Sequence, residues 1–387
     1  MPNSAAPILP GSTIGILGSG QLGRMFTMSA RTMGYRVHTL SPDTDTPTGQ
    51  VADKEIVAEY DNLDAVREFA RAVDVVTFEF ENVPSATTDA IAGIVPVRPS
   101  GRALDITQNR LREKTFLKSI GVPHAQFESV TNLADLERAV GLIGLPAILK
   151  TAGFGYDGKG QFRITQRADI EAAWEAMDGH PAILERVVSF EFEFSVVAAR
   201  GIFGDFAAYP PIHNVHQNHI LSVSQMPAPG MSSRSIASAF EIVRSIFDGL
   251  ELIGLACVEF FFTAESGLIV NEIAPRPHNS GHLTIEGNIT SQFEQQLRAV
   301  CGLRLGSVDM KLPAAAMMNV MGDMWPENGE PDWLAAASVP AAKIHLYGKH
   351  EARAGRKMGH VSASSLTPED AFRTVLAARN ALQRITV

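Results

Sequence analysis

The chain has 387 residues, which suggests two or three domains, and its 45% hydrophobic and 19% charged residues exclude bulk disorder. A formal charge of -9, from 33 Lys and Arg against 42 Asp and Glu, disfavours a coat for nucleic acid or anionic membrane as the main role. Cys257 and Cys301 lack the spacing of a zinc or disulfide framework, and no apolar run nears the roughly 18 residues that span a bilayer, so we expect a soluble cytoplasmic protein.

The N-terminal third alternates between short apolar runs and helical patterns. Residues 1–12 lack the features of a signal peptide, and we expect a flexible tail there. Strand-like runs occupy 13–20, 35–42, 73–80 and 94–100, and helical patterns occupy 21–34, 63–72 and the segment from residue 85. This alternation predicts an α/β domain with a parallel sheet.

The middle of the chain changes to a mostly antiparallel pattern. We expect helices at 111–121, 133–141 and 232–250, strands at 145–150, 161–165, 182–188 and 189–199, and a hairpin of 256–263 with 268–274. These elements predict an α+β catalytic domain. Several short strands and an alanine-rich final helix then indicate a small third domain.

Gly18, Gly20 and Gly23 form a G-x-G-x-x-G motif between a strand and a helix. Backbone amides at such a helix start bind anions, and in a dinucleotide site Asp43 would face a ribose. Pro42 and the polar residues around it place Asp43 in a loop, which argues against the dinucleotide. An anion site and simple tight packing of strand against helix both remain open.

A second glycine-rich segment, 153–160, resembles a Walker A loop but departs from it at one position. Gly160 stands where a Ser or Thr would reach magnesium, and a strand follows in place of a helix. We therefore predict a flap between two strands, in which Lys159 and backbone amides close over phosphates. An ordinary hairpin turn is the alternative.

The hairpin provides the strongest physical argument for a metal site. If residues 264–267 form the turn, Thr263 pairs with Leu268, and counting outward places Glu259 opposite Glu272. Like charges at such positions destabilise a sheet, so we expect magnesium between them, with Asn271 as a further oxygen donor. Protonation of one acid, or a bulge that separates them, are the alternatives.

Three further groups of polar residues are candidates. Glu185 ends an apolar strand and fits either the edge of a purine or a salt bridge, and Glu193 alternates with phenylalanines on a strand that could equally face solvent. The polar loop 274–282 follows the paired acids directly. A basic group near the C-terminus fits a phosphate pocket or a solvated face; its members are Lys349, Arg353, Arg356, Lys357 and His360.

Seven motifs in order carry a family resemblance over about residues 12–362. They are GILGSGQLGRM, FEFENVP, GYDGKGQ, HNVHQN, CVEFF, NEIAPRPHNSGH and GRKMGH. Together they resemble the 5-(carboxyamino)imidazole ribonucleotide synthases, ATP-grasp enzymes of purine biosynthesis. The resemblance implies a Rossmann-like domain at 13–110, an ATP-grasp domain at 111–305, a small C-terminal domain at 306–387, and a homodimer.

The resemblance also implies a reaction. ATP phosphorylates bicarbonate to carboxyphosphate, which carboxylates the 5-amino group of 5-aminoimidazole ribonucleotide and leaves ADP and phosphate. ATP and Mg²⁺ are the implied cofactors, and no biotin takes part. Small molecules, and neither nucleic acid nor membrane, are the implied partners.

Residue roles follow from the same resemblance. Catalytic roles are implied for Lys150, Lys159, Arg276, His278 and Asn279. ATP binding is implied for Arg110, Lys150, Gly155, Tyr156, Asp157, Gly158, Lys159, Gly160, Gln161, Glu185, Arg186, Val187, Val188, Glu193, His216, Asn271 and Glu272. Binding of the imidazole nucleotide is implied for Gln21, Leu22, Glu81, Arg276, His278, Asn279, Ser280, Lys349, Arg356 and Lys357. Glu259 and Glu272 are the implied metal ligands.

Two rival functions remain open. Another ATP-grasp ligase, such as a formate-dependent glycinamide ribonucleotide transformylase, shares the glycine turn, the paired acids and a C-terminal phosphate pocket. A non-catalytic nucleotide-binding regulator is the second rival, although the presence of both acids and of Lys150 and Lys159 argues against it.

Overall fold

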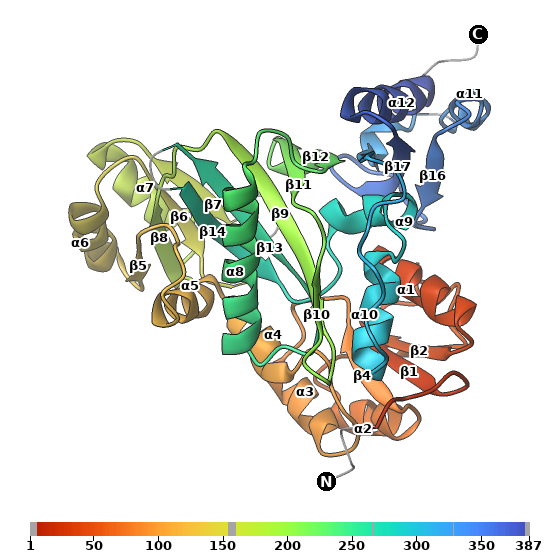
Figure 1. Cartoon of the computed structure of the whole chain (residues 1–387). Helices are drawn as coiled ribbons and strands as arrows, with labels where there is room; N and C mark the ends of the chain where they lie inside the picture. Colours follow the sequence, from red (N-terminus) through yellow and green to blue (C-terminus); the bar gives the residue numbers. More distant parts are fainter. Residues whose placement is uncertain (1–5, 154–159, 265–266, 328, 384–387) are drawn as a thin grey trace.

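The N-terminal part of the computed structural model, which describes residues 6–153, 160–264, 267–327 and 329–383, is a parallel sheet. Its strand order is β3-β2-β1-β4, which confirms the predicted α/β domain (Figure 1). The strands are β1 (Thr13–Leu17), β2 (Arg36–Ser41), β3 (Lys54–Val57) and β4 (Val75–Phe78), and the helices are α1 (Gln21–Thr32), α2 (Leu63–Arg71) and α3 (Ser85–Ala92).

The strand that we expected at 94–100 is absent from this part of the structure. Val97 makes only an isolated bridge to Val76, and Pro96 and Pro99 have no N–H group to donate to a ladder. Instead, α4 (Gly101–Thr107) follows, with the Ser100 side chain capping its first turn. This prediction was wrong because the prolines outweigh the apolar pattern.

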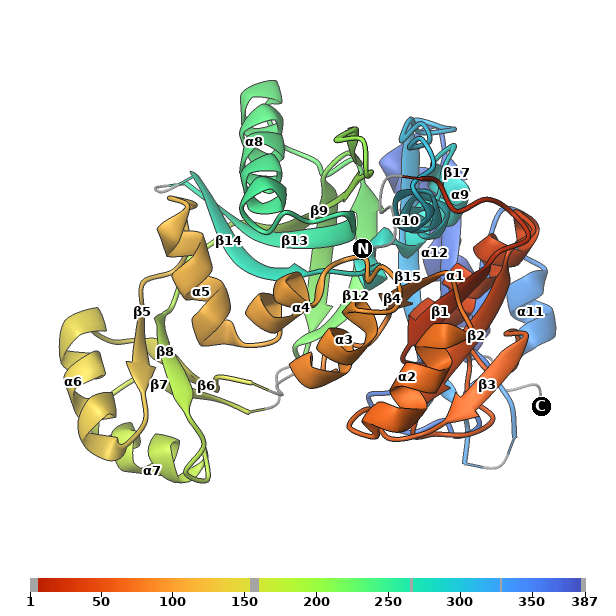
Figure 2. The same cartoon turned by 90° about the horizontal axis from the view of Figure 1, so that it is seen from below.

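A separate antiparallel sheet lies at the far end of the molecule (Figure 2). Its order is β5-β8-β6-β7, and two helices cover one face. The strands are β5 (Phe127–Val130), β6 (Ala147–Thr151), β7 (Gln161–Ile164) and β8 (Ala182–Arg186), with α5 (Arg110–Ser119) before them and α6 (Leu133–Ile143), a short 3₁₀ turn at Arg167–Asp169 and α7 (Ile170–Glu175) between them.

A nine-stranded sheet forms the centre and continues into the C-terminal part. Its order is β14-β13-β9-β11-β12-β15-β17-β16, with β10 beside β9. The strands are β9 (Phe192–Arg200), β10 (Phe206–Ala208), β11 (Ile212–Gln217), β12 (Ile220–Met226), β13 (Gly254–Thr263), β14 (Gly267–Ala274), β15 (Ala314–Met321), β16 (Lys343–Leu346) and β17 (Lys357–Ser365). Because β12 pairs with β15, the predicted third domain shares the central sheet.

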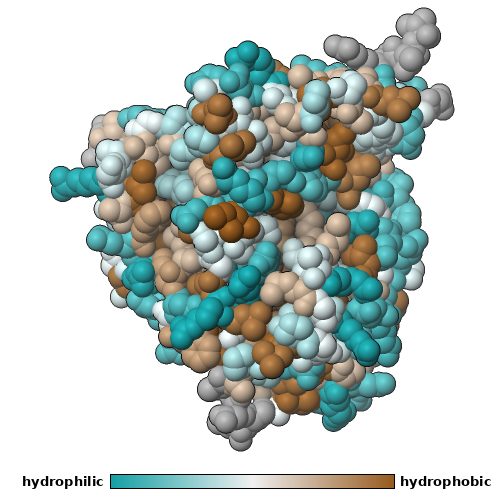
Figure 3. Space-filling model, turned by 45° about the vertical axis from the view of Figure 1, so that its right-hand side comes forward, coloured by the Kyte–Doolittle hydropathy of each residue, from teal (hydrophilic) through white to brown (hydrophobic). Residues whose placement is uncertain are grey.

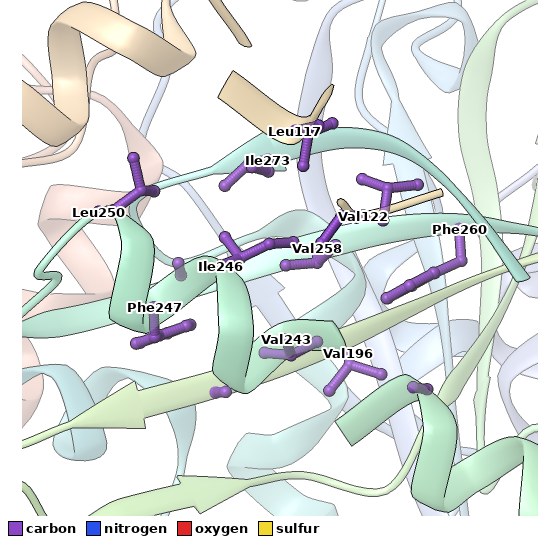
Figure 4. Close-up of a cluster of buried hydrophobic side chains, with 14 of the residues drawn as sticks. Leu117, Val122, Val196, Val243, Ile246, Phe247, Leu250, Val258, Phe260 and Ile273 are labelled. Carbon is purple, nitrogen blue, oxygen red and sulfur yellow. The ribbon is translucent and has the colours of Figure 1, made fainter. Parts of the chain in front are cut away.

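The helices of this half are unequal in length. They are α8 (Ser233–Gly249), α9 (Thr284–Gly287), α10 (Gln292–Cys301), α11 (Trp333–Ala337) and α12 (Pro368–Ala381), with short 3₁₀ turns η2 (Asn279–Leu283) and η3 (Gly322–Met324). The α8 side chains at helical spacing, Val243, Ile246 and Phe247, are fully buried against Val196 of β9 and Val258 of β13 (Figure 4). Each such side chain contributes roughly 1.5–3 kcal/mol on burial.

Helix α10 joins the N-terminal sheet to the central sheet. Phe293, Leu297 and Val300 pack with Phe26 of α1 in one buried cluster, and α10 lies beside α1 in Figures 1 and 2. The guanidinium of buried Arg98 donates to the Val300 carbonyl oxygen at 2.7 Å. The N-terminal domain is therefore fixed against the edge of the site described below.

The outer surface mixes polar and apolar residues on the face that Figure 3 presents. Among the described residues, no helix is long and apolar enough to cross a membrane. Cys257 and Cys301 are both buried and free, so they form no disulfide.

Candidate functional site

The β13–β14 hairpin brings the two predicted metal acids opposite each other, by a different register from the expected one. Near the turn Thr263 pairs with Gly267, where we expected Leu268. A bulge between Phe260 and Glu259 then leaves Asn271 unpaired and restores the pairing of Glu259 with Glu272. The register at the turn was wrong, and the bulge corrected it.

The bulged strand β14 is an edge strand, and helix α5 holds it on both sides of Glu272. Lys114 Nζ donates to the carbonyl oxygen of Asn271, and Glu113 Oε2 accepts the N–H of Ile273 at 2.9 Å. Both α5 side chains are almost wholly buried. Because bulges and edges leave backbone groups unpaired, these two residues satisfy groups that the sheet cannot.

The paired acids differ in their electrostatics. Glu259 is buried, and His278 Nε2 lies 3.0 Å from its Oε1. Desolvation alone would raise the pKa of Glu259, but His278 lowers it to about 2. The pKa of Glu272 is raised; because this residue is exposed, we assign the rise to the charge of Glu259 and not to desolvation. His278 thus offsets part of the repulsion that we expected a metal to offset.

Two carboxylates at one hairpin position suit a magnesium ion, which takes one or two carboxylates together with substrate phosphates. Within the described ranges, no three His, Cys, Asp or Glu side chains cluster as a metal site by themselves. The donors present are therefore oxygen donors for a hard cation that shares its shell with a ligand, and they fit magnesium.

Lys150 and Glu185 meet on the small antiparallel sheet. Lys150 Nζ lies 2.6 Å from Glu185 Oε2, so the salt-bridge alternative for Glu185 is realised. Desolvation opposes it, but Lys150 and Lys114 lower the pKa of Glu185. Arg110, the first residue of α5, donates from Nη1 to the carbonyl oxygen of Thr151 at 2.8 Å, at the end of the Lys150 strand. Lys150, Arg110 and Lys114 therefore gather positive charge around Glu185 on the small antiparallel sheet.

The predicted flap lies largely outside the described residues, since Gly155, Tyr156, Asp157, Gly158 and Lys159 are not among them. Gly160 and Gln161 are described. Gly160 has a positive φ of 68° and accepts the N–H of Thr151, and Gln161 pairs with Lys150 where β7 begins. The segment does join two antiparallel strands.

The remaining ATP-side residues lie on or directly beyond β8, β9 and β11. The backbone after Glu185 runs on through Arg186, Val187 and Val188, and the Val187 N–H donates to the carbonyl oxygen of Pro146. His216 Nδ1 lies 2.8 Å from Glu193 Oε2. Desolvation would lower the pKa of His216, but Glu193 raises it. The structure therefore brings Glu193 and His216 together.

The first glycine motif binds a carboxylate of the chain itself. Glu79 Oε1 accepts the N–H of Gly20 at 2.7 Å at the start of α1, and a Cβ on Gly18 or Gly20 would meet this carboxylate. Desolvation raises the pKa of Glu79, against the effect of the amides. The glycine turn is thus an anion site whose anion is the Glu79 carboxylate of the protein itself. Gln21 and Leu22 form the first turn of the helix behind it.

Two charges join the N-terminal domain to the loop 275–283, which comprises the segment after β14 and η2. Arg276 Nη2 lies 2.7 Å from Glu81 Oε1, although the two residues are far apart in the sequence. His278 Nδ1 shares a 2.8 Å hydrogen bond with Ser280 Oγ. Both polar atoms of the Asn279 amide are buried without a hydrogen-bond partner, as for a side chain that awaits a ligand.

The C-terminal basic group divides into two parts. His360 is fully buried and hydrogen-bonds the Tyr347 hydroxyl, so this residue does not belong to a basic face. Lys349 Nζ donates to the carbonyl oxygen of Lys357, and Arg356 donates to that of Glu351. The charge of Lys349 opposes the rise that desolvation causes in the pKa of Glu79. The charge of Lys357 contributes to the lowered pKa of Glu259. The two lysines therefore act on the same site.

Several residues that shape this site escaped the sequence interpretation. Glu79 directly follows β4, the strand beside the glycine turn. Side chains at the carboxyl ends of parallel strands meet at one edge of the sheet, and this rule could have identified Glu79. Glu113, Lys114 and Gln292 act through backbone groups of distant segments, and no local pattern marks them.

Comparisons with known proteins agree along the chain. Residues 12–108, 115–293 and 315–373 match family models described as the ribonucleotide synthetase preATP-grasp domain, the ATP-grasp domain and the phosphoribosylaminoimidazole carboxylase C-terminal domain. An N5-carboxyaminoimidazole ribonucleotide synthase of Bacillus subtilis is 42% identical over 94% of this chain and 94% of its own length. The bifunctional purine synthesis protein purC/E of Dictyostelium discoideum is 42% identical over 93% of this chain, which spans only 38% of that protein.

A solved structure adds ligands to the comparison. The N5-carboxyaminoimidazole synthase of Aspergillus clavatus, in complex with ADP and 5-aminoimidazole ribonucleotide, has a TM-score of 0.86 and 31% identity. It covers 97% of this chain and 99% of its own.

Proposed function

Because the chain belongs to the family of N5-carboxyaminoimidazole ribonucleotide synthases, we propose that it carboxylates the 5-amino group of 5-aminoimidazole ribonucleotide with bicarbonate and ATP. ADP, phosphate and the carboxyamino nucleotide leave, in a step of purine biosynthesis. One observation carries the proposal: the Glu81–Arg276 ion pair joins the N-terminal domain to the loop that follows the paired acids. Groups suited to phosphoryl transfer and groups suited to a second nucleotide therefore converge.

ATP binds between the small antiparallel sheet and the central sheet in this proposal. Lys150 and Arg110 contact its phosphates, the flap from Gly155 to Gln161 closes over them, and Glu193 with His216 borders the ribose. The strand end at Glu185, Arg186, Val187 and Val188 holds adenine. The cations that lower the pKa of Glu185 support this arrangement, because a triphosphate requires positive charge around it.

Magnesium is held by Glu259 and Glu272, with Asn271 beside them. When bound, the ion neutralises charge on the transferred phosphoryl group. The opposed carboxylates support this proposal. Lys114 and Glu113 fix the strand that carries Glu272, so the chain positions this acid before any ligand arrives.

The imidazole nucleotide lies between the N-terminal and C-terminal parts. Gln21, Leu22, Glu81 and Ser280 border it, and Lys349, Arg356 and Lys357 bind its 5′-phosphate. Arg276, His278 and Asn279 face bicarbonate and its phosphorylated product, together with Lys150 and Lys159. The unpartnered amide of Asn279 supports this role, since a ligand would satisfy both of its polar atoms.

The reaction proceeds in two displacements. A bicarbonate oxygen attacks the γ-phosphorus and ADP leaves, which forms carboxyphosphate. The amine nitrogen then bonds to the carboxyl carbon as phosphate leaves, and the nitrogen loses a proton. The residues orient both nucleotides and exclude water, because carboxyphosphate is a reactive mixed anhydride. Biotin takes no part, and we propose a cytoplasmic homodimer.

The test is ADP release with magnesium and bicarbonate in the presence of alternative acceptors. Aminoimidazole ribonucleotide should stimulate release strongly, whereas glycinamide ribonucleotide with formate should not. Faster release with the second pair would assign the chain to another ATP-grasp ligase. If neither acceptor stimulates ADP release, the result would favour a non-catalytic regulator.

A further inference from the structure

A line of hydrogen bonds crosses the central sheet and ends at Glu259. Ser224 Oγ donates to Asn214 Oδ1 at 2.8 Å, and Asn214 Nδ2 donates to Ser195 Oγ at 3.0 Å. Ser195 Oγ and Ser280 Oγ are 2.7 Å apart and hydrogen-bonded. The line continues through the Ser280–His278 hydrogen bond to the His278–Glu259 contact.

The sheet register explains why these side chains meet. Ser195 of β9 pairs with Glu259 of β13, and Glu259 pairs with Glu272, so the three share one face. Asn214 of β11 pairs with Ser224 of β12 and lies two residues along from Ile212, the partner of Ser195. The paired acids therefore lie at the end of a polar row that continues on the sheet through Ser195, Asn214 and Ser224.

Because this row is buried, each of its polar side chains needs a hydrogen-bond partner within the protein. Ser195, Ser224 and Ser280 have no exposed surface, and Asn214 is only 4% exposed. A buried hydroxyl or amide without a partner destabilises the folded state, so each member of the row depends on the next. Networks of this kind fix a single side-chain arrangement when every member is satisfied.

We infer that Ser195 and Asn214 are positioning residues for the His278 imidazole, acting through Ser280. This inference deepens the proposed function, because it rests on the role of His278 beside Glu259. The backbone of the loop is held separately: Gln292 Nε2 donates to the His278 carbonyl oxygen at 2.8 Å, and Gln292 Oε1 accepts the His278 N–H at 3.0 Å. Ser195 and Asn214 therefore position the His278 imidazole ring, while Gln292 positions the backbone of the loop.

This separation predicts a specific kinetic effect. Ser195→Ala should let the His278 ring reorient without moving the loop backbone. Turnover should then fall about tenfold while the KM for ATP stays within about twofold, since misplacement of a reacting group costs rate more than binding.

The matched control is Ser222→Ala. Ser222 is another buried serine of the same sheet, on β12, and its hydroxyl donates to Gln217 and takes no part in the line. Ser195→Ala should lose more thermal stability than Ser222→Ala, because it leaves Asn214 Nδ2 without its acceptor, and only Ser195→Ala should lose turnover. Ser195→Ala combined with Ser280→Ala should be no slower than Ser280→Ala alone, because the two hydroxyls act as one unit.

A spectroscopic readout separates this inference from the proposed function. In protein with ¹⁵N-labelled histidine, the His278 Nδ1 resonance, assigned with His278→Gln, should shift in Ser195→Ala and, to a smaller extent, in Ser224→Ala. It should stay in place in Ser222→Ala. An unmoved resonance in Ser195→Ala, or independent multiplicative losses in the double variant, would overturn the inference. Failure of aminoimidazole ribonucleotide as a substrate would leave the resonance test intact.

Discussion

The β13–β14 hairpin and the loop 275–283 are consecutive in the chain but are held in different ways. The hairpin is held by backbone pairing and by two buried ionisable side chains of one helix, Glu113 and Lys114. The loop is held by the Arg276–Glu81 ion pair and by uncharged side chains, chiefly Gln292 and the Ser195–Ser280 contact. One helix therefore fixes the strand that carries Glu272, while the loop depends on contacts from several elements.

The largest expected effect is on the hairpin side. Glu272→Gln removes one of two opposed carboxylates but keeps the shape of the side chain. Turnover should fall roughly 10³-fold, because charge at the transferred phosphoryl group loses its stabilisation. Thermal stability should hold or rise, since like charges opposite each other destabilise a sheet.

Glu241→Gln is the control for that substitution, since Glu241 is an exposed residue of α8. It should change neither quantity. Full turnover in Glu272→Gln would contradict a role of this acid in metal binding. A clear loss of melting temperature would show that the acid has a structural role.

Lys114→Met tests how charge holds the hairpin. The Asn271 carbonyl oxygen would lose its donor, and the buried Glu113 and Glu185 would lose a neighbouring cation. The free energy of unfolding should fall by about 3 kcal/mol in urea denaturation. Lys118→Met, an exposed substitution on the same helix, should cost less than about 0.5 kcal/mol. Equal losses in both variants would contradict the role of Lys114.

Gln292→Leu tests the loop with a matched partner on the same helix. Gln295 is also buried and holds both backbone groups of Gly306, away from the loop. Each Leu variant should lose about 2 kcal/mol of stability, because two backbone groups become unpaired. Only Gln292→Leu should also reduce turnover, and a similar reduction in Gln295→Leu would refute a specific effect on the loop.

The smallest expected effect is a pH dependence on the loop side. Desolvation lowers the pKa values of the buried His282 and His360 well below the usual value. The unfolded chain therefore binds more protons as the pH falls through about 6.5, so stability is lost on acidification and is present above that pH. Between pH 7 and 6 these two histidines should together contribute a loss of about 1 kcal/mol, and His278 should offset part of it, because Glu259 beside it raises its pKa against the effect of desolvation.

Hydrogen exchange locates this effect. Amides of 279–283 should exchange faster at pH 6 relative to the hairpin amides of 268–274, and His360→Gln should weaken the dependence. If acidification raised the exchange rates of both segments equally, the pH effect would not be specific to the loop.

The sequence predicted the hairpin better than the loop for a physical reason. A hairpin is local, so a turn assumption gives the pairing of Glu259 with Glu272, and a bulge at Asn271 compensated for the wrong turn. The contact of Ser195 with Ser280 depends on strand order across the whole sheet, which no local pattern contains. Glu81 and Arg276 were placed together only by resemblance to a family, and Glu79 was missed altogether.

The two segments have one shared purpose in this account, which is the transfer of a phosphoryl group to bicarbonate. The direct test is a single turnover with ¹⁸O-labelled bicarbonate, ATP and aminoimidazole ribonucleotide, followed by mass analysis of the released phosphate. Carboxyphosphate keeps one bicarbonate oxygen on phosphorus when its carbon–oxygen bond breaks, so each phosphate should carry one ¹⁸O atom. Phosphate without ¹⁸O, released together with carboxylated product, would contradict the account.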